Sequence, residues 1–302
     1  MECYFCLSTN LKETFRQRRI DYDSKIFIFF YCCKCFGYSL FPKLTEPQIQ
    51  YLYSLDYVTN LTEKENSQEN PEWDRFVQLQ SFFNSFKGLE RSKFLDYGCG
   101  ADPVTFSIAQ VAGFEPNGME YSEDVRELAM ENSGSYVYSR DEILKSNLKY
   151  DIIFLGDVIE HLVNPELELR LLHEKLSPEG TLVAQGPLQG AWTVTHFVVM
   201  LFAMVTKIKT TDFPPYHVSL ANRKSMVKIM KSSGFTNIKI ECTEVTWPAP
   251  DLTSFLSNPS IRSLILFISK GIDKFLGRIF QKFGSRYFLV CIADTNSGVE
   301  KK

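Results

Sequence analysis

The chain has 302 residues, of which 44% are hydrophobic and 23% are charged, and its formal net charge is −3. This is the composition of an ordinary globular protein with enough apolar side chains for a sizeable core. A slightly acidic chain has no overall attraction for nucleic acid, so nucleic acid is not expected as a partner. The first ten residues lack a basic segment followed by an apolar one, and the eight cysteines are expected to be reduced. The predicted location is the cytoplasm.

Two short cysteine pairs, Cys3-x-x-Cys6 and Cys32-x-x-Cys35, lie near the N-terminus. Two residues between thiolates allow one tight turn to direct both sulfurs at one ion, and two such turns complete a tetrahedral site. Residues 1–45 are therefore predicted to form a zinc ribbon. A closed four-cysteine site leaves no open coordination position, so the zinc is expected to be structural. The alternatives are four buried small hydrophobic residues or a redox-active pair.

Residues 46–92 are predicted to form a helical linker region. The segment Glu46–Tyr57 has apolar residues at helical spacing. A second helix is expected to begin at Pro71, with Asn70 as its N-cap, and to end at Gly88.

From Lys93 to the end of the chain, strand-like runs alternate with helical runs. The strand-like runs are KFLDYG, PNGMEY, SYVYS, YDIIFLGD and GTLVAQGP. The helical runs are PVTFSIAQVAG, SEDVRELAMENS and NPELELRLLHEKLS. This alternation predicts an α/β domain over residues 93–302, with a Rossmann-like, doubly wound and mostly parallel sheet. Ligands of such sheets bind at the carboxyl ends of the strands.

A glycine pair follows the first predicted strand of this domain. Gly98 and Gly100 allow a tight turn and a close approach of a ligand to the backbone. Glu120 ends the next strand, where a carboxylate can accept hydrogen bonds from both hydroxyls of a ribose. A glycine pair between a strand and a helix, with an acid at the next strand end, favours a nucleoside-containing cofactor. The alternative is a glycine turn in an unrelated α/β protein.

The motifs FLDYGCG, GMEYS, DIIFLGDVIEHL and LSPEGTLVAQGP resemble the class I methyltransferases related to the ubiquinone-pathway methyltransferases. The cysteine pairs, with YCCKCFGYSLFP and QYLYSLDY, are similar to the zinc-ribbon branch of that group. HVSLANRKSMVKIMKSSGF resembles its late helix, and SRYFLVCIAD resembles its final strand. The resemblance covers most of the chain, with gaps at roughly 61–90, 188–213 and 247–283.

The resemblance implies an enzyme that uses S-adenosylmethionine as its cofactor. Gly98 and Gly100 would lie against the methionine part, and Glu120 would hold the ribose. Asp141 would lie near the adenine amino group, and Asp157 would close the site. The full set of expected cofactor-binding residues is Asp96, Gly98, Gly100, Glu120, Tyr121, Asp141 and Asp157.

Asp102 departs from the family pattern, which usually has a third glycine at this position. Its side chain can N-cap the helix that Pro103 begins, or face the ammonium group of the cofactor. If it instead filled the cofactor space, the chain would be a non-catalytic partner protein with a closed site.

Methyl transfer from a sulfonium mainly requires alignment of donor and acceptor, and an oxygen or nitrogen acceptor also needs a base near pH 7. Asp157, Glu160 and His161 have i, i+3, i+4 spacing, which places them on one face of a helical turn. His161 is the first candidate for the base and His217, in PPYHVSL, is the second. The alternatives for the trio are a divalent-ion site, as in some quinone-pathway relatives, or a purely structural His161.

Two apolar segments lie near the end of the chain. Residues 188–215 are expected to form a lid over an apolar acceptor or a buried helix. Residues 261–284 are a candidate basic amphipathic helix, which would either rest on an anionic membrane or pack on the core with a solvated basic side. Neither segment has the roughly 20 apolar residues that a membrane-spanning helix needs.

The expected acceptor is a small molecule, a sugar or sugar-nucleotide, by analogy with relatives that serve polysaccharide assembly. The alternatives are a lipid or quinone-like acceptor, or an RNA. The acidic net charge and the absence of an Asn/Asp-Pro-Pro-Tyr/Phe motif after the fourth strand disfavour RNA. No oligomeric state is predicted.

Overall fold

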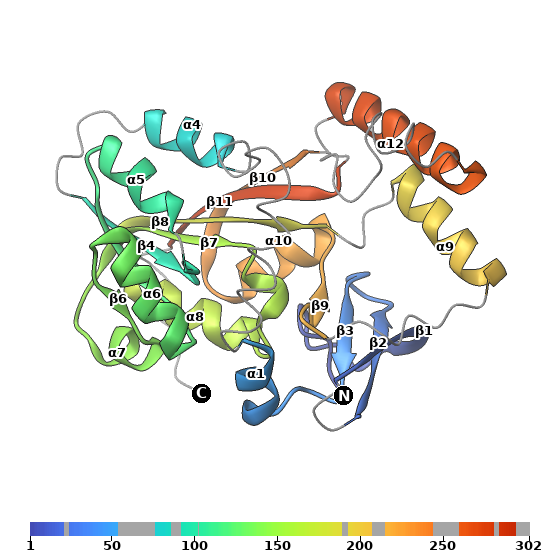
Figure 1. The fold of residues 1–302 in the computed structure, drawn as a ribbon, viewed down its shortest axis with the longest axis horizontal. Helices are drawn as coiled ribbons and strands as arrows, with labels where there is room; N and C mark the ends of the chain where they lie inside the picture. The colour runs from blue at the N-terminus through green and yellow to red at the C-terminus, as the bar shows by residue number, and fades with distance from the viewer. Residues whose placement is uncertain are drawn as a thin grey trace.

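The computed structural model describes residues 1–20, 24–53, 76–85, 92–101, 103–188, 193–206, 215–243, 260–280 and 284–293. Within these residues the chain forms a large central sheet flanked by helices and a smaller N-terminal sheet beside it (Figure 1). None of the described helices is both long enough and apolar enough to cross a membrane.

The central sheet has seven strands in the order β10-β11-β8-β7-β4-β5-β6. Their bounds are β4 Lys93–Tyr97, β5 Glu115–Met119, β6 Val137–Tyr138, β7 Tyr150–Gly156, β8 Leu176–Pro187, β10 Phe235–Thr243 and β11 Arg286–Ala293. Neighbouring strands are parallel except at β11, which is antiparallel to both β8 and β10. The predicted Rossmann-like, mostly parallel sheet is confirmed.

Helices cover both faces of this sheet, because alternate residues of each buried strand point to opposite sides. In β7, Ile152 and Phe154 pack in a cluster with side chains of α4 and α5, whereas Ile153 and Leu155 pack in a cluster with side chains of α8 and α10. The helices are α4 Val77–Ser85, α5 Val104–Val111, α6 Glu123–Ser133, α7 Arg140–Lys145, α8 Pro165–Lys175 and α10 Arg223–Ser232. Because both faces of the central sheet are buried, the sequences of its central strands are continuous apolar runs.

The N-terminal sheet consists of the antiparallel strands β1 Leu11–Arg19, β2 Ile26–Cys32 and β3 Tyr38–Phe41. A fourth strand, β9 Ser219–Leu220, pairs with β3 and comes from the large domain. The ribbon is therefore joined to the large domain by backbone hydrogen bonds as well as by side-chain packing.

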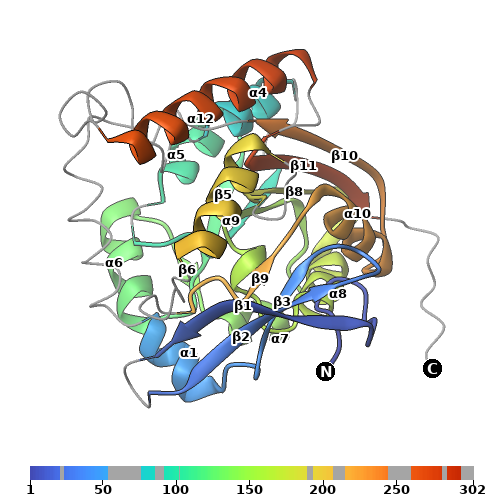
Figure 2. The same cartoon turned by 90° about the vertical axis from the view of Figure 1, so that its right-hand side faces the viewer.

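The predicted linker region contains α1 Glu46–Leu52 and α4, while most of the expected segment between them lies outside the described residues. Beyond β8, α9 Val194–Thr206 and α12 Ile261–Ile279 pack against each other at one side of the molecule (Figure 2). Helix α12 is continuous over 19 residues, through Gly271 and Gly277.

Candidate functional site

A tight turn follows β4, at the point where the strand order reverses between its neighbours β5 and β7. Gly98 and Gly100 in this turn have φ values of +86° and +70°, which glycine adopts without strain. A Cβ atom at Gly98 would lie 2.7 Å from Cγ2 of Val158, whereas one at Gly100 would meet no atom of the described residues within 4 Å. Gly98 thus permits the loop after β7 to pack against the turn, and Gly100 faces open space. Ligands of α/β sheets bind at such a reversal point.

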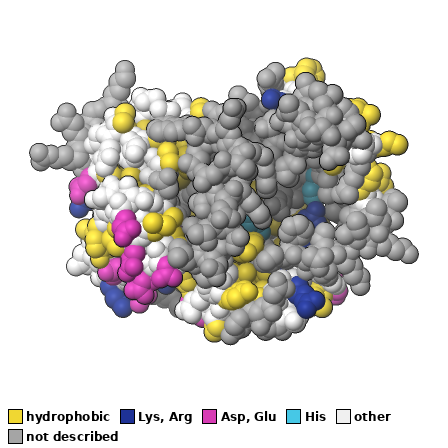
Figure 3. Space-filling model, viewed as in Figure 1, with side chains coloured by type: hydrophobic (Ala, Val, Ile, Leu, Met, Phe, Trp, Pro, Cys, Tyr) yellow, Lys and Arg dark blue, Asp and Glu magenta, His cyan; other side chains and the backbone are white. Residues whose placement is uncertain are grey.

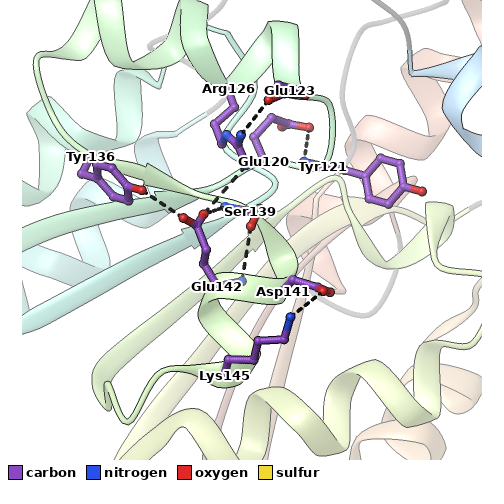
Figure 4. Close-up of polar contacts among 9 residues, drawn as sticks. All are labelled: Glu120, Tyr121, Glu123, Arg126, Tyr136, Ser139, Asp141, Glu142 and Lys145. Atoms are coloured by element: carbon purple, nitrogen blue, oxygen red, sulfur yellow. Dashed lines mark hydrogen bonds and ion pairs between the residues drawn. The ribbon is translucent and has the colours of Figure 1, made fainter.

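The carboxylate of Glu120, which follows β5, lies across this turn. Its Oε2 accepts a hydrogen bond from the Gly100 N–H at 3.0 Å. Its Oε1 accepts from the Ser122 N–H at 3.3 Å and from the Tyr121 N–H at 2.7 Å, and Figure 4 shows the contact with Tyr121. Burial raises the pKa of Glu120, and the N–H groups of Gly100 and Ser122 oppose that shift. A carboxylate fixed in this way has a defined orientation at the carboxyl end of the sheet.

Three other predicted cofactor residues have different surroundings. Asp96 is buried and accepts a hydrogen bond from the Thr105 hydroxyl of α5, so it fixes that helix against β4. Tyr121 is 38% exposed. Asp141 lies at the start of α7 with its side chain 71% exposed, where it forms an ion pair with Lys145 at 3.1 Å (Figure 4). Asp102 lies outside the described residues.

Asp157, after β7, forms an ion pair that the sequence did not suggest. Its Oδ2 lies 2.7 Å from Nη2 of Arg286, and its backbone has the left-handed φ of +55°. Arg286 is available there because β11 is antiparallel to β8, and it is paired in register with Pro187 at the end of β8.

The predicted helical trio of Asp157, Glu160 and His161 is wrong in its geometry. The backbone at Asp157 is left-handed, and the 3-10 helix η1 (Ile159–His161) begins two residues later, so Asp157 does not lie on the face that the spacing predicts. Potential metal-ligand atoms of Glu160, His161 and His217 instead lie within 4.8 Å of one another.

The two candidate histidines, 56 positions apart in the sequence, lie next to each other. The rings of His161 and His217 are 4.9 Å apart and packed edge to face. Nδ1 of His161 lies 2.9 Å from the Tyr216 carbonyl oxygen and 2.7 Å from the Tyr53 hydroxyl oxygen. Because a carbonyl only accepts hydrogen bonds, the contact with Tyr216 places a proton on Nδ1, and the neutral ring then has its lone pair on Nε2.

Charged groups from three parts of the chain lie near His217. Its pKa is lowered to about 4, chiefly by burial, and the positive charges of Arg18 and Arg286 contribute to the shift while Asp157 opposes it. His217 is therefore neutral at pH 7. Arg18 belongs to β1, so the N-terminal ribbon contributes a cation to the surroundings of the histidine pair.

The four N-terminal cysteines form one cluster. Sγ of Cys3 lies 3.4 Å from Sγ of Cys35, and Sγ of Cys6 lies 3.6 Å from Sγ of Cys32. All four sulfurs lie within 4.8 Å of one another. In a tetrahedral site with Zn–S bonds of about 2.3 Å, neighbouring sulfurs are about 3.8 Å apart. The cluster has the dimensions of a zinc site.

The sequence model of the family described as "Methyltransferase domain" matches residues 66–240, more than half of the chain. A solved structure with the same fold is magnesium protoporphyrin IX methyltransferase from Synechocystis PCC 6803, which is 14% identical. The match covers 83% of this chain and 100% of that one, with a TM-score of 0.50.

Two further solved structures are similar to this chain with TM-scores of 0.49. A SAM-dependent methyltransferase from Archaeoglobus fulgidus is 23% identical over 78% of this chain and 99% of that one. Phosphoethanolamine N-methyltransferase 2 from Haemonchus contortus is 16% identical over 85% of this chain, which spans only 62% of that longer protein. No curated protein matches the sequence. The family match and the order of the seven strands together show that the chain belongs to the methyltransferase domain family and is a class I methyltransferase.

Proposed function

We propose that this methyltransferase uses S-adenosylmethionine and methylates a small acceptor with an anionic group, specifically a sugar or sugar-nucleotide. The observation that carries the cofactor part is the open space beside Gly100, with the Glu120 carboxylate held across the same turn. This arrangement lies where α/β sheets bind nucleoside-containing ligands.

The residues at this edge of the sheet fit the cofactor. Gly98 and Gly100 supply a backbone without side chains for the methionine part, and Glu120 supplies acceptor oxygens for the ribose hydroxyls. Tyr121 and Asp141 lie near the ends of β5 and β6, where they would contact the adenosine part. Asp157 would border the site through its ion pair with Arg286. When bound, S-adenosylmethionine supplies an activated methyl group, so the protein mainly has to align the acceptor.

The histidine pair is the proposed acceptor side of the site. The Nε2 lone pair of His161 makes this residue the first candidate for the base, and the neutral His217 is the second. The guanidinium groups of Arg18 and Arg286 favour an acceptor with a phosphate or carboxylate, because arginine binds such groups through two parallel hydrogen bonds.

The zinc proposal concerns the ribbon alone. Cys3, Cys6, Cys32 and Cys35 fit one zinc ion, and four protein ligands would leave no position for a substrate. The ion would stabilise the ribbon and take no part in methyl transfer. As an alternative to acting as a base, the histidine pair would bind a divalent ion together with Glu160, through Glu160, His161 and His217.

Calorimetric titration with S-adenosylmethionine tests the cofactor proposal. The native chain is expected to bind, and Glu120→Gln is expected to bind about 13- to 150-fold more weakly, because a hydrogen bond to a charged group contributes roughly 1.5–3 kcal/mol. Glu115→Gln is the matched control, since Glu115 lies at the opposite end of β5. Absence of binding by the metal-replete native chain would favour a partner protein with a closed site.

Acceptor classes are then compared by methyl transfer to a nucleotide-linked sugar, the same free sugar and an apolar quinol. A lower KM for the nucleotide-linked sugar, lost in Arg18→Met, supports the anionic acceptor. A preference for the quinol would support the alternative, which is favoured by the exposed Phe197 and Leu201 of α9.

A further inference from the structure

The helix α12 presents its apolar side to the outside of the protein. Its exposed large apolar residues recur every three or four positions, which places them along one face of the helix. They are Ile261, Leu264, Ile265, Ile268, Ile272, Phe275 and Ile279. A helix on the surface of a globular protein normally turns such a stripe towards the core.

The most deeply buried side chains described in α12 are polar. Ser269 and Asp273 are only 3% and 2% exposed. The Asp273 carboxylate accepts hydrogen bonds from the backbone N–H groups of Val194 at 2.7 Å and Thr195 at 2.8 Å, in the first turn of α9. A carboxylate at a helix N-terminus is favourable because it compensates the helix dipole. These bonds fix the rotation of α12 about its axis, and a rotation that buried the apolar stripe would break them.

The adjoining helix α9 extends the apolar surface with Phe197 and Leu201. Together with Phe280, which follows α12, the two helices contribute ten of the twenty exposed large apolar side chains among the described residues. Figure 3 shows hydrophobic side chains along the upper right of the molecule, over α12 and α9. A concentration of this kind marks an interaction surface rather than the scattered apolar exposure of ordinary proteins.

The charges on α12 identify the kind of partner. Its sequence contains Arg262, Lys270, Lys274 and Arg278, and its single acidic residue is Asp273, which is buried. The chain as a whole has a net charge of −3, so this cationic helix is a local feature. Two copies of such a helix would repel each other if they were packed face to face. An anionic lipid surface offers both an apolar layer and negative headgroups.

We infer that α9 and α12 form a membrane-docking face, by which the methyltransferase lies on an anionic bilayer without crossing it. The apolar stripe of α12, with Phe197 and Leu201 of α9, enters the boundary between headgroups and acyl chains. The exposed Lys274 lies at the level of the headgroups. This inference is independent of the acceptor and of cofactor binding.

Flotation of the full-length chain with lipid vesicles tests the inference. Vesicles of phosphatidylcholine alone are compared with vesicles that also contain phosphatidylglycerol. The native chain is expected to float with the mixed vesicles. Ile268→Glu/Phe275→Glu is expected to weaken that binding at least about tenfold, because two anchoring side chains become charged. The matched control is Val111→Glu, since Val111 is an exposed apolar residue of α5 outside this face.

Lys274→Glu measures the electrostatic part separately. A lysine near an anionic surface is worth about fivefold in affinity, so the preference for phosphatidylglycerol should fall at least about fivefold. Circular dichroism and melting temperatures of all variants show whether they fold. The inference is overturned if the native chain floats with neither vesicle, or if folded Ile268→Glu/Phe275→Glu floats as the native chain does. It is also overturned if the native chain is a dimer that binds no vesicles and that this variant converts to monomers.

Discussion

Replacing Gly100 with alanine adds one methyl group to the space proposed for the cofactor. The position has a φ of +70°, and the added Cβ would meet no atom within 4 Å in the part of the chain that the structure describes. The folded state is therefore destabilised only by the strain of an L-residue in the left-handed region, about 1–2 kcal/mol. A bound cofactor would additionally overlap the methyl group, and overpacking costs typically 1–3 kcal/mol, equivalent to about 5- to 150-fold in affinity.

Gly113→Ala is the matched control for this experiment. Gly113 also has a positive φ, +89°, and an added Cβ there would likewise meet no described atom within 4 Å. It precedes β5, however, at the amino end of the strand. Both variants should lose the same free energy of unfolding in urea titrations, and only Gly100→Ala should lose affinity for S-adenosylmethionine by calorimetry. Equal affinities of the two variants would refute the placement of the cofactor beside Gly100.

Three further changes test other parts of the site. Tyr53→Phe removes the hydroxyl 2.7 Å from Nδ1 of His161; kcat should fall about 2- to 13-fold, the value of one hydrogen bond, with an altered pH profile. Cys32→Ser should abolish binding of one zinc per chain, measured by atomic absorption, and lower the melting temperature. The pKa of His217 is lowered from 6.5 to about 4, so the unfolded state takes up the proton first. Stability should therefore fall between pH 6.5 and pH 4, by up to about 3 kcal/mol, and His217→Gln should flatten this dependence in urea titrations.

The sheet could be predicted from the sequence because its signals are local. Buried parallel strands such as β7 are short apolar runs, and the helices between them have apolar residues at helical spacing. The short helix α7 was not predicted, because its six residues are too few to show a period. Its start depends instead on a capping box, in which Ser139 and Glu142 bond each other's backbone N–H groups.

The glycine turn and Glu120 could be found for the same reason, since each directly follows a strand. The partners of the histidines and of Asp157 could not be predicted, because these contacts depend on tertiary structure. Tyr53 is 108 positions from His161, and Arg286 is 129 positions from Asp157. The helical spacing of Asp157 and His161 was misleading, since a left-handed residue precedes the 3-10 turn. No signal in the sequence indicated Arg286, because its place depends on the antiparallel direction of β11, which the structure shows.

The ribbon and the acceptor side of the site are coupled through the backbone of Val218. Its carbonyl accepts a hydrogen bond from Leu40 N–H of β3 at 2.9 Å, and its own N–H donates to the Glu160 carbonyl at 2.9 Å. Val218 therefore ties the ribbon to the turn that carries His161, and it directly follows His217. Asn222 adds a hydrogen bond from its side-chain amide to the carbonyl of Cys35 at 3.1 Å. Loss of order at the cysteine cluster would consequently reach both histidines within a few hydrogen bonds, so the proposed structural zinc ion would influence the alignment of the proposed acceptor without contacting it.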